Sequence, residues 1–283
     1  MKAIAAILPV LLVLFGASKT IAFVPNSSTI LARVAKSAGK GMYVVEQEVS
    51  FRTAADPVVV REHWLIESSE SMRVTVNSQK GATEPFLYNI IYRDGRRWAP
   101  EAGQLKSGAQ SSEFLEGLIY ARSSKSIANI LMRAKVLPPS FFRERTRAIT
   151  STGVKYEPEP GVRLARFAGV VNYFFGLPTP AASETLNPGV WIEQDSFFVR
   201  KIRTPSQSEM LMDKPSVSGG LRLARERIFN WDTNSVGVRV LSVRSAPGAS
   251  AGQINPNSLS STELRNQKLP ETPQVQEFYK RFR

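Results

Sequence analysis

Apolar and polar residues alternate along successive stretches of this sequence, and no other feature restricts the fold as strongly. From Tyr43 to Phe51 the odd positions read Tyr, Val, Gln, Val and Phe, whereas Glu46, Glu48 and Ser50 hold even positions. Side chains of a β-strand point to opposite faces in turn, so this period of two predicts a strand with one buried face. The alternation returns in residues 58–67, 72–77 and 88–98.

Short connections between these segments predict antiparallel pairing. Asp94-Gly95 is a two-residue hairpin signal between Tyr92 and Arg97. Parallel neighbours would need crossovers of about a dozen residues or more. Further strands are expected at 162–175, in a hairpin over 189–203 that turns near Gln194-Asp195, at 209–213, and in a final hairpin over 221–244 around Asp232-Thr233-Asn234.

Helical spacing interrupts this pattern in three places. Ser27 or Ser28 can cap a first helix that ends near Ser37, before Gly39 and Gly41. Residues 111–147 form a helical insert that is broken at Pro138-Pro139, and residues 273–282 have the spacing of a short amphipathic helix. Residues 246–270 are rich in Ser, Asn, Gly and Pro, which predicts a linker over the surface. The fold class expected is mainly β (α+β).

The first 22 residues have the pattern of a cleavable signal peptide. Lys2 precedes an apolar run from Ala3 to Phe15, and small residues follow it. This run is too short for a bilayer core of about 30 Å, although an uncleaved anchor is the alternative. Cleavage is expected after Ser18 or Ala22. The sequence has no cysteine, which excludes a cysteine-linked lipid anchor and disulfides. We expect export to the periplasm and no stable membrane span after cleavage.

Positive charge dominates the sequence, with a formal net charge of +13. The basic clusters are Arg93, Arg96 and Arg97; Arg143, Arg145 and Arg147; Arg200, Lys201 and Arg203; and Arg222, Arg225 and Arg227. A solvated strand face that aids solubility is the interpretation we adopt. In the cell envelope the alternative partners are phospholipid headgroups, lipopolysaccharide and acidic peptides, and we expect no nucleic acid.

Three segments carry a resemblance to a known fold. They are the helix–Gly–strand entry Gly41–Val49, the strand Arg61–Ile66, and the segment Pro188–Glu193 that runs into Val199–Arg203. Over about 27–245 the order of elements resembles the LolA/LolB-type lipoprotein carriers and outer-membrane lipoprotein-sorting proteins. The resemblance implies one curved antiparallel sheet in an unclosed barrel over 23–245, with helices on its concave side. The residue pattern adds a tail at 246–283 with a short C-terminal helix. It also implies shielding of lipoprotein acyl chains between membranes. The insert at 111–147 and the basic tail have no clear counterpart in the carrier.

Two short strings imitate catalytic motifs. Gly248–Gly252 fits the nucleophile elbow G-x-S-x-G, but it lies in the expected linker and the only histidine, His63, is far upstream. Ser37–Lys40 fits S-x-x-K, but the string ends a helix instead of beginning one. With one histidine and no cysteine, we predict neither an enzyme nor a metal or cofactor site.

The candidate ligand site is the apolar face of the first strands. Its residues are Tyr43, Val45, Val49, Phe51, Trp64, Ile66, Met72, Val74, Tyr88, Ile90, Tyr92 and Trp98. An acyl chain of about 16 carbons gains roughly 12 kcal/mol on leaving water, so an empty cavity of that size needs an apolar cover. The candidate lid is Phe114, Leu115, Leu118, Ile119, Ile130 and Leu131. The alternative is an ordinary core packed under the helices.

Two functions follow from these expectations. The first is a non-enzymatic carrier or chaperone for lipoprotein acyl chains or free lipid, with transport partners at the inner or outer membrane. The second is a binding or sensing module on the same fold that contacts a protein or an anionic polymer through its basic surface. Bound lipid after purification indicates the first, and a stoichiometric protein partner indicates the second.

Overall fold

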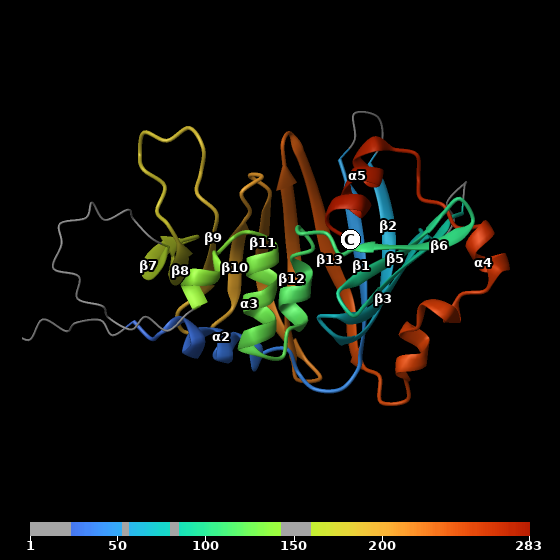
Figure 1. The fold of residues 1–283 in the computed structure, drawn as a ribbon, viewed down its shortest axis with the longest axis horizontal. Helices are drawn as coiled ribbons and strands as arrows, with labels where there is room; N and C mark the ends of the chain where they lie inside the picture. Colours follow the sequence, from blue (N-terminus) through green and yellow to red (C-terminus); the bar gives the residue numbers. More distant parts are fainter. Residues whose placement is uncertain (1–23, 53–56, 80–84, 143–159) are drawn as a thin grey trace, which may run out of the picture.

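Thirteen strands form one antiparallel sheet in the computed structural model, which describes residues 24–52, 57–79, 85–142 and 160–283 (Figure 1). The strands are β1 (Tyr43–Phe51), β2 (Val58–Ser68), β3 (Ser71–Ser78), β4 (Leu87–Arg93), β5 (Arg96–Glu101), β6 (Gln104–Ala109), β7 (Gly161–Phe167), β8 (Val170–Gly176), β9 (Gly189–Glu193), β10 (Val199–Arg203), β11 (Glu209–Ser218), β12 (Leu221–Trp231) and β13 (Asn234–Ser245).

Strand order follows the chain except at one junction. From one edge to the other the order is β6-β5-β4-β3-β2-β1-β13-β12-β11-β10-β9-β8-β7. The long-range pairing of β1 with β13 therefore joins two meanders into one sheet, with Tyr43 opposite Ser245 and Phe51 opposite Val236. β6 and β7 do not pair with each other, so the sheet is not closed into a barrel. This confirms the predicted mainly β fold with an unclosed antiparallel sheet.

Tight turns set the register of the hairpins. Asp94 and Gly95 both have positive φ and connect the pair Arg93–Arg96, as the Asp-Gly signal predicts. The last hairpin is also confirmed, with a two-residue turn at Asp232 and Thr233. The segment predicted as strand at 162–175 is a hairpin that turns at Ala168-Gly169. The sequence pattern missed β6, because QLKSGA has no alternation.

Helices cover one face of the sheet, which we call the inner face (Figure 1). They are α2 (Ser27–Ala35), the 3-10 helix η1 (Glu116–Tyr120), α3 (Ser124–Arg133), the 3-10 helix η2 (Pro139–Phe142) and α5 (Pro273–Arg281). α2 is capped by Asn26, one residue before the predicted serines. The first predicted helix of the insert is only the short η1, and the basic residues 143–147 lie outside the described residues, as do residues 1–22.

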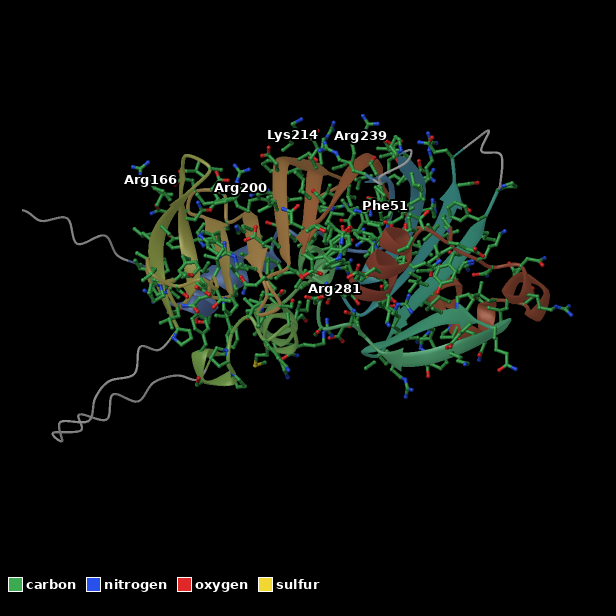
Figure 2. All side chains as sticks on the ribbon, turned by 90° about the horizontal axis from the view of Figure 1, so that it is seen from above. Phe51, Arg166, Arg200, Lys214, Arg239 and Arg281 are labelled. Atoms are coloured by element: carbon green, nitrogen blue, oxygen red, sulfur yellow. The ribbon has the colours of Figure 1, made fainter. Side chains whose placement is uncertain are left out.

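The opposite, outer face carries charged side chains and the tail. Figure 2 shows Arg200, Lys214 and Arg239 on the side of the sheet away from α3. Residues 246–270, for which the sequence predicts a linker over the surface, cross the outer face and contain η3 (Ala251–Ile254), η4 (Pro256–Ser258) and α4 (Ser261–Arg265). Ile254 and Leu259 are buried there against Val44, Leu65 and Ile91. The tail is thus fixed to the sheet by a small second core.

Candidate functional site

The structure brings most of the sequence-predicted ligand residues together on the inner face. Ten of them are buried in the main core: Tyr43, Val45, Val49, Phe51, Trp64, Ile66, Met72, Val74, Ile90 and Tyr92. Tyr88 is half-buried beside them. Trp98 does not belong to this set, because it packs in the second core on the outer face. β5 pairs Arg97 with Tyr92 and Trp98 with Ile91, which gives Trp98 the opposite orientation.

Aromatic side chains from the covering elements fill the space above these residues. Phe114 stacks on Tyr92 and on Trp64, with ring centroids 4.3 and 6.2 Å apart. From α5, Phe278 lies 5.3 Å from Phe51 between ring centroids. The ring centroid of Phe282 lies 5.0 Å from that of Trp231 and 5.3 Å from that of Phe229. Such pairs contribute beyond their buried area, so this half of the inner face is a packed core.

Four buried charges lie inside this packed half. Nε and Nη1 of Arg283 lie 3.0 Å from Glu62 Oε1 and 2.5 Å from Glu116 Oε2, respectively. Arg227 Nε lies 2.8 Å from Glu116 Oε1, and all four side chains are fully buried. Two carboxylates and two guanidinium groups therefore balance. Removing one member would leave an uncompensated charge in the core.

Neutral side chains complete this cluster around Glu62. Its carboxylate accepts hydrogen bonds from Gln47 Nε2 at 2.5 Å, from Trp64 Nε1 at 2.8 Å and from the Tyr279 hydroxyl at 2.8 Å. Burial by itself would raise the pKa of Glu62, but Arg283 and these donors hold that pKa below its usual value. Burial and the Glu62 carboxylate raise the pKa of Tyr279. We call Glu62, Glu116, Arg227, Arg283 and Gln47 the buried ion cluster.

The sequence contained a signal for part of this cluster. Gln47 and Glu62 each occupy a position whose alternation assigns it to the apolar face of its strand. Arg227, placed with the solvated basic face by sequence, is instead buried on β12 between inward-facing neighbours. A polar residue at an inward position predicts a buried partner, because an unpaired polar group in a core is costly. Which partners meet could not be read from the sequence.

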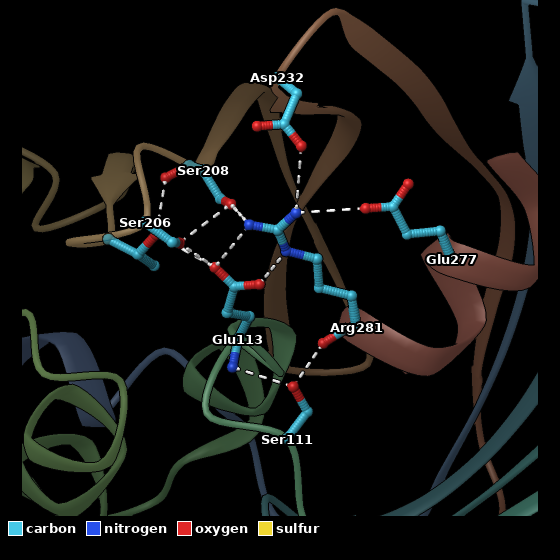
Figure 3. A network of polar contacts seen from close by, with 8 residues as sticks. Ser111, Glu113, Ser206, Ser208, Asp232, Glu277 and Arg281 are labelled. Carbon is cyan, nitrogen blue, oxygen red and sulfur yellow. Dashed lines mark hydrogen bonds and ion pairs between the residues drawn. The ribbon is translucent and has the colours of Figure 1, made fainter.

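A second polar network ties α5 to two loops (Figure 3). Arg281 bonds the Glu113 carboxylate, and its Nη2 donates to Ser208 Oγ at 2.9 Å. Ser111 Oγ donates to the Arg281 carbonyl at 2.5 Å. Burial would raise the pKa of Glu113, but hydrogen bonds from Arg281 and Ser206 hold it below its usual value. This network, through Arg281, and the buried ion cluster, through Arg283, together hold the C-terminal end of α5 in place.

The other half of the inner face, under α2 and α3, is built differently. α3 buries Ile127, Ala128, Ile130 and Leu131 in the main core. Among the described residues, no ion pair links α3 to the sheet. A void of about 30 Å³ lies in this half, between the end of α2, η1 and strands β10–β12. Its lining is Val34, Ser37, Leu118, Ile119, Phe197, Phe198, Val199, Met212 and Arg222. Of the six predicted lid residues, Ile130 and Leu131 lie on α3 and Leu118 and Ile119 lie on η1. Phe114 and Leu115 precede η1, and Phe114 packs in the other half on Trp64. All six are buried except Ile119, which is partly buried.

The strings that imitate catalytic motifs have no catalytic geometry. Ser250 precedes the four-residue η3, whereas a nucleophile elbow requires a strand before the serine and a helix after it. Ser37 and Lys40 follow the end of α2. His63 lies on β2, with Nδ1 3.8 Å from Glu46. Over the described ranges, no group of three or more His, Asp or Glu residues is placed to hold a metal ion. No helix in that part of the chain is long and apolar enough to cross a membrane.

The architecture is similar to that of solved structures. A LolA superfamily protein from Nitrosomonas europaea matches with a TM-score of 0.53 and 10% identity over 83% of this chain and 100% of that chain. The chain has a LolA-like fold. A DUF1329 family protein from Desulfovibrio piger matches with a TM-score of 0.52 and 11% identity, over 83% of this chain and 98% of that chain. No family model and no curated protein matches the sequence. In this LolA-like fold, buried ion pairs hold one half of the inner face, whereas in the other half no ion pair of the described residues joins α3 to the sheet.

Proposed function

We propose that the protein is a non-enzymatic periplasmic carrier that shelters an acyl chain of a lipoprotein or a free lipid. The acyl chain lies between α3 and strands β8–β12 of the LolA-like fold. The observation that carries it is the contrast between the two halves of the inner face. α5 is held by buried ions, whereas α3 rests on the core through apolar side chains, and a void lies between the end of α2, η1 and strands β10–β12.

Energetics support α3 as the moving cover, because Glu116 ties η1 to Arg227 and Arg283 through buried ion pairs. The void of about 30 Å³ has room for water but not for an acyl chain, so an acyl chain enters only if covering residues leave. Each methylene that replaces an apolar side chain regains about 0.8 kcal/mol, so the exchange is nearly balanced. Moving α5 instead would separate buried ion pairs, at about 3–5 kcal/mol for each unpaired group. The site proposed here therefore lies mainly outside the predicted strand residues of β1–β5.

A second candidate is a binding or sensing module that uses the outer surface and carries no lipid. The filled interior above β1–β5 favours it, because Phe114 and α5 leave packed aromatic rings where a ligand was expected. The two candidates differ in what they predict for the interior. A carrier exchanges side chains for lipid, whereas a module keeps the core dry and intact.

Native mass spectrometry of the full chain purified from a periplasm tests the proposal. The carrier predicts added mass from a phospholipid or an acylated peptide. A module predicts the mass of the chain alone or with a stoichiometric protein partner. Binding of the fluorescent fatty acid cis-parinaric acid to delipidated protein gives the affinity in solution.

Two tryptophan variants then locate the bound acyl chain on the inner face. Ile119→Trp fills the void, and we expect it to weaken cis-parinaric acid binding by about tenfold or more. Tyr88→Trp is the matched control, because Tyr88 is equally half-buried but lies in the β1–β5 half. If Tyr88→Trp blocks binding and Ile119→Trp does not, the ligand lies in the half predicted from sequence. Unchanged affinity in both variants contradicts an inner-face site.

A further inference from the structure

A second hollow opens at the surface where α2 ends and α3 begins. It has a volume of about 740 Å³. Its lining is Ala32, Ala35, Lys36, Gly39, Lys40, Tyr43, Arg122, Ser123, Ser124, Gly219 and Gly220. Three separate parts of the chain thus meet there: the end of α2 with the following loop, the start of α3, and the turn between β11 and β12. We call this hollow the basic pocket.

All charged side chains that line the basic pocket are positive. Lys36, Lys40 and Arg122 line it, and its lining contains no Asp or Glu. None of the three forms an ion pair with a carboxylate of the described residues. Clustered cations that lack counter-charges create a local potential that concentrates anions.

A groove on the outer face differs from the basic pocket in the charge of its lining. It has a volume of about 640 Å³ and is lined by both signs of charge. There Arg200 lies 3.0 Å from Asp213, and Arg239 lies 3.0 Å from Glu48. The cations of that groove are already neutralised, so a general excess of positive charge does not explain the basic pocket.

The floor of the basic pocket is fixed. The Tyr43 hydroxyl accepts a hydrogen bond from Lys40 N at 3.0 Å and donates one to Gly219 O at 2.9 Å. A Cβ at Gly39 would lie 2.2 Å from this hydroxyl, so only glycine fits there. Tyr43 therefore holds the loop after α2 against the β11–β12 turn. Lys36, Lys40 and Arg122 therefore surround a pocket floor that these contacts hold in place without a ligand.

The start of α3 forms part of the pocket wall through Ser123 and Ser124. Ser123 Oγ caps the helix by accepting from Ser126 N at 3.0 Å, and no acidic residue stands in the first turn. The positive end of the helix dipole is thus not offset by a side chain. This contribution reinforces the three cations and has the same sign.

We propose that the basic pocket binds a phosphate group. A phosphate carries the negative charge and the several acceptor oxygens that Lys36, Lys40 and Arg122 can satisfy together. The last turn of α2 separates the two hollows, since Ala35 lines the pocket and Val34 lines the void. This places a headgroup next to an acyl chain, and for that role the inference rests on the proposed function. The phosphate group comes from a phospholipid headgroup or from free phosphate.

Calorimetric titration of the full chain at low salt tests the pocket with two probes. Inorganic phosphate has no acyl chain, and dihexanoylphosphatidylglycerol below its micelle concentration has a phosphodiester headgroup. The pocket variant Lys36→Gln/Lys40→Gln/Arg122→Gln is expected to weaken binding of the recognised probe by at least about tenfold. The control Arg61→Gln/Arg166→Gln/Arg225→Gln removes the same charge from exposed positions that do not line the pocket, and its affinity should stay within about twofold.

The outcomes separate the sources and the two proposals. Binding of inorganic phosphate that is lost in the pocket variant alone supports a free-phosphate site, and the same loss for the lipid probe alone supports a headgroup site. Equal weakening in both variants, or no binding of either probe, overturns the pocket. Cis-parinaric acid binding should persist in the pocket variant, so a failed pocket leaves the carrier standing, and a failed carrier leaves phosphate binding measurable.

Discussion

Arg283 lies with Nη1 2.5 Å from Glu116 Oε2, and neither side chain is exposed to solvent. The bond connects Arg283, two residues after the end of α5, to Glu116 in η1, more than a hundred positions away in the chain. The same guanidinium group also pairs with Glu62, which lies on β2. One arginine therefore holds two covering elements and the sheet together.

Arg283→Met is expected to lower the free energy of unfolding by about 3–5 kcal/mol, because Glu62 and Glu116 lose their shared partner in the core. Urea denaturation measures the change. Arg225→Met, on the exposed side of β12, is the control and should stay within about 0.5 kcal/mol. A loss below about 1 kcal/mol for Arg283→Met would show that the pair contributes little to stability.

Stability should also fall in acid. The folded-state pKa of Glu62 and Glu113 lies below the usual value of 4.5. As the pH drops below about 4.5, the unfolded chain binds protons that the folded carboxylates still exclude, so the free energy of unfolding decreases. Glu62→Gln removes one of these groups. Its loss of stability between neutral pH and acid should be smaller than that of the unmodified protein, and an equal loss would contradict the assignment.

Ser123→Ala tests whether α3 moves. The serine caps α3, so its removal should cost about 1 kcal/mol of stability and loosen the helix. We expect faster uptake of cis-parinaric acid in stopped-flow fluorescence. Asn26→Ala removes the matching cap of α2 at a similar cost, and its uptake rate should not change. The same rate in all three proteins would contradict an opening at α3.

Ile254→Ala tests whether the tail is part of the folded unit. Ile254 is fully buried between the tail and the outer face, so the truncation should cost about 2–5 kcal/mol in thermal or urea unfolding. Leu241→Ala, at a side chain that is 42% exposed, should change stability by less than about 0.5 kcal/mol. A neutral Ile254→Ala would indicate a tail that is detached in solution.

Local patterns determined the strands and their turns. The alternation at Tyr43–Phe51 and the Asp94-Gly95 turn depend on neighbours within a few residues, so the sequence contains them directly. The same holds for the amphipathic spacing of α5 and for the burial of Val275, Phe278, Tyr279 and Phe282. An irregular strand such as β6 has no such pattern and was missed.

The sequence by itself therefore determined an antiparallel, mainly β chain with inward aromatic rows. Only the tertiary structure decided that Phe114 and α5 fill the space above Trp64 and Phe51. It also decided that Glu62 and Glu116 meet Arg283, and that Gln47 and Arg227 bond these carboxylates. The physical reason is distance along the chain. Periodicity records which face a side chain takes, but the pairing of charges across long separations depends on packing that no local window contains.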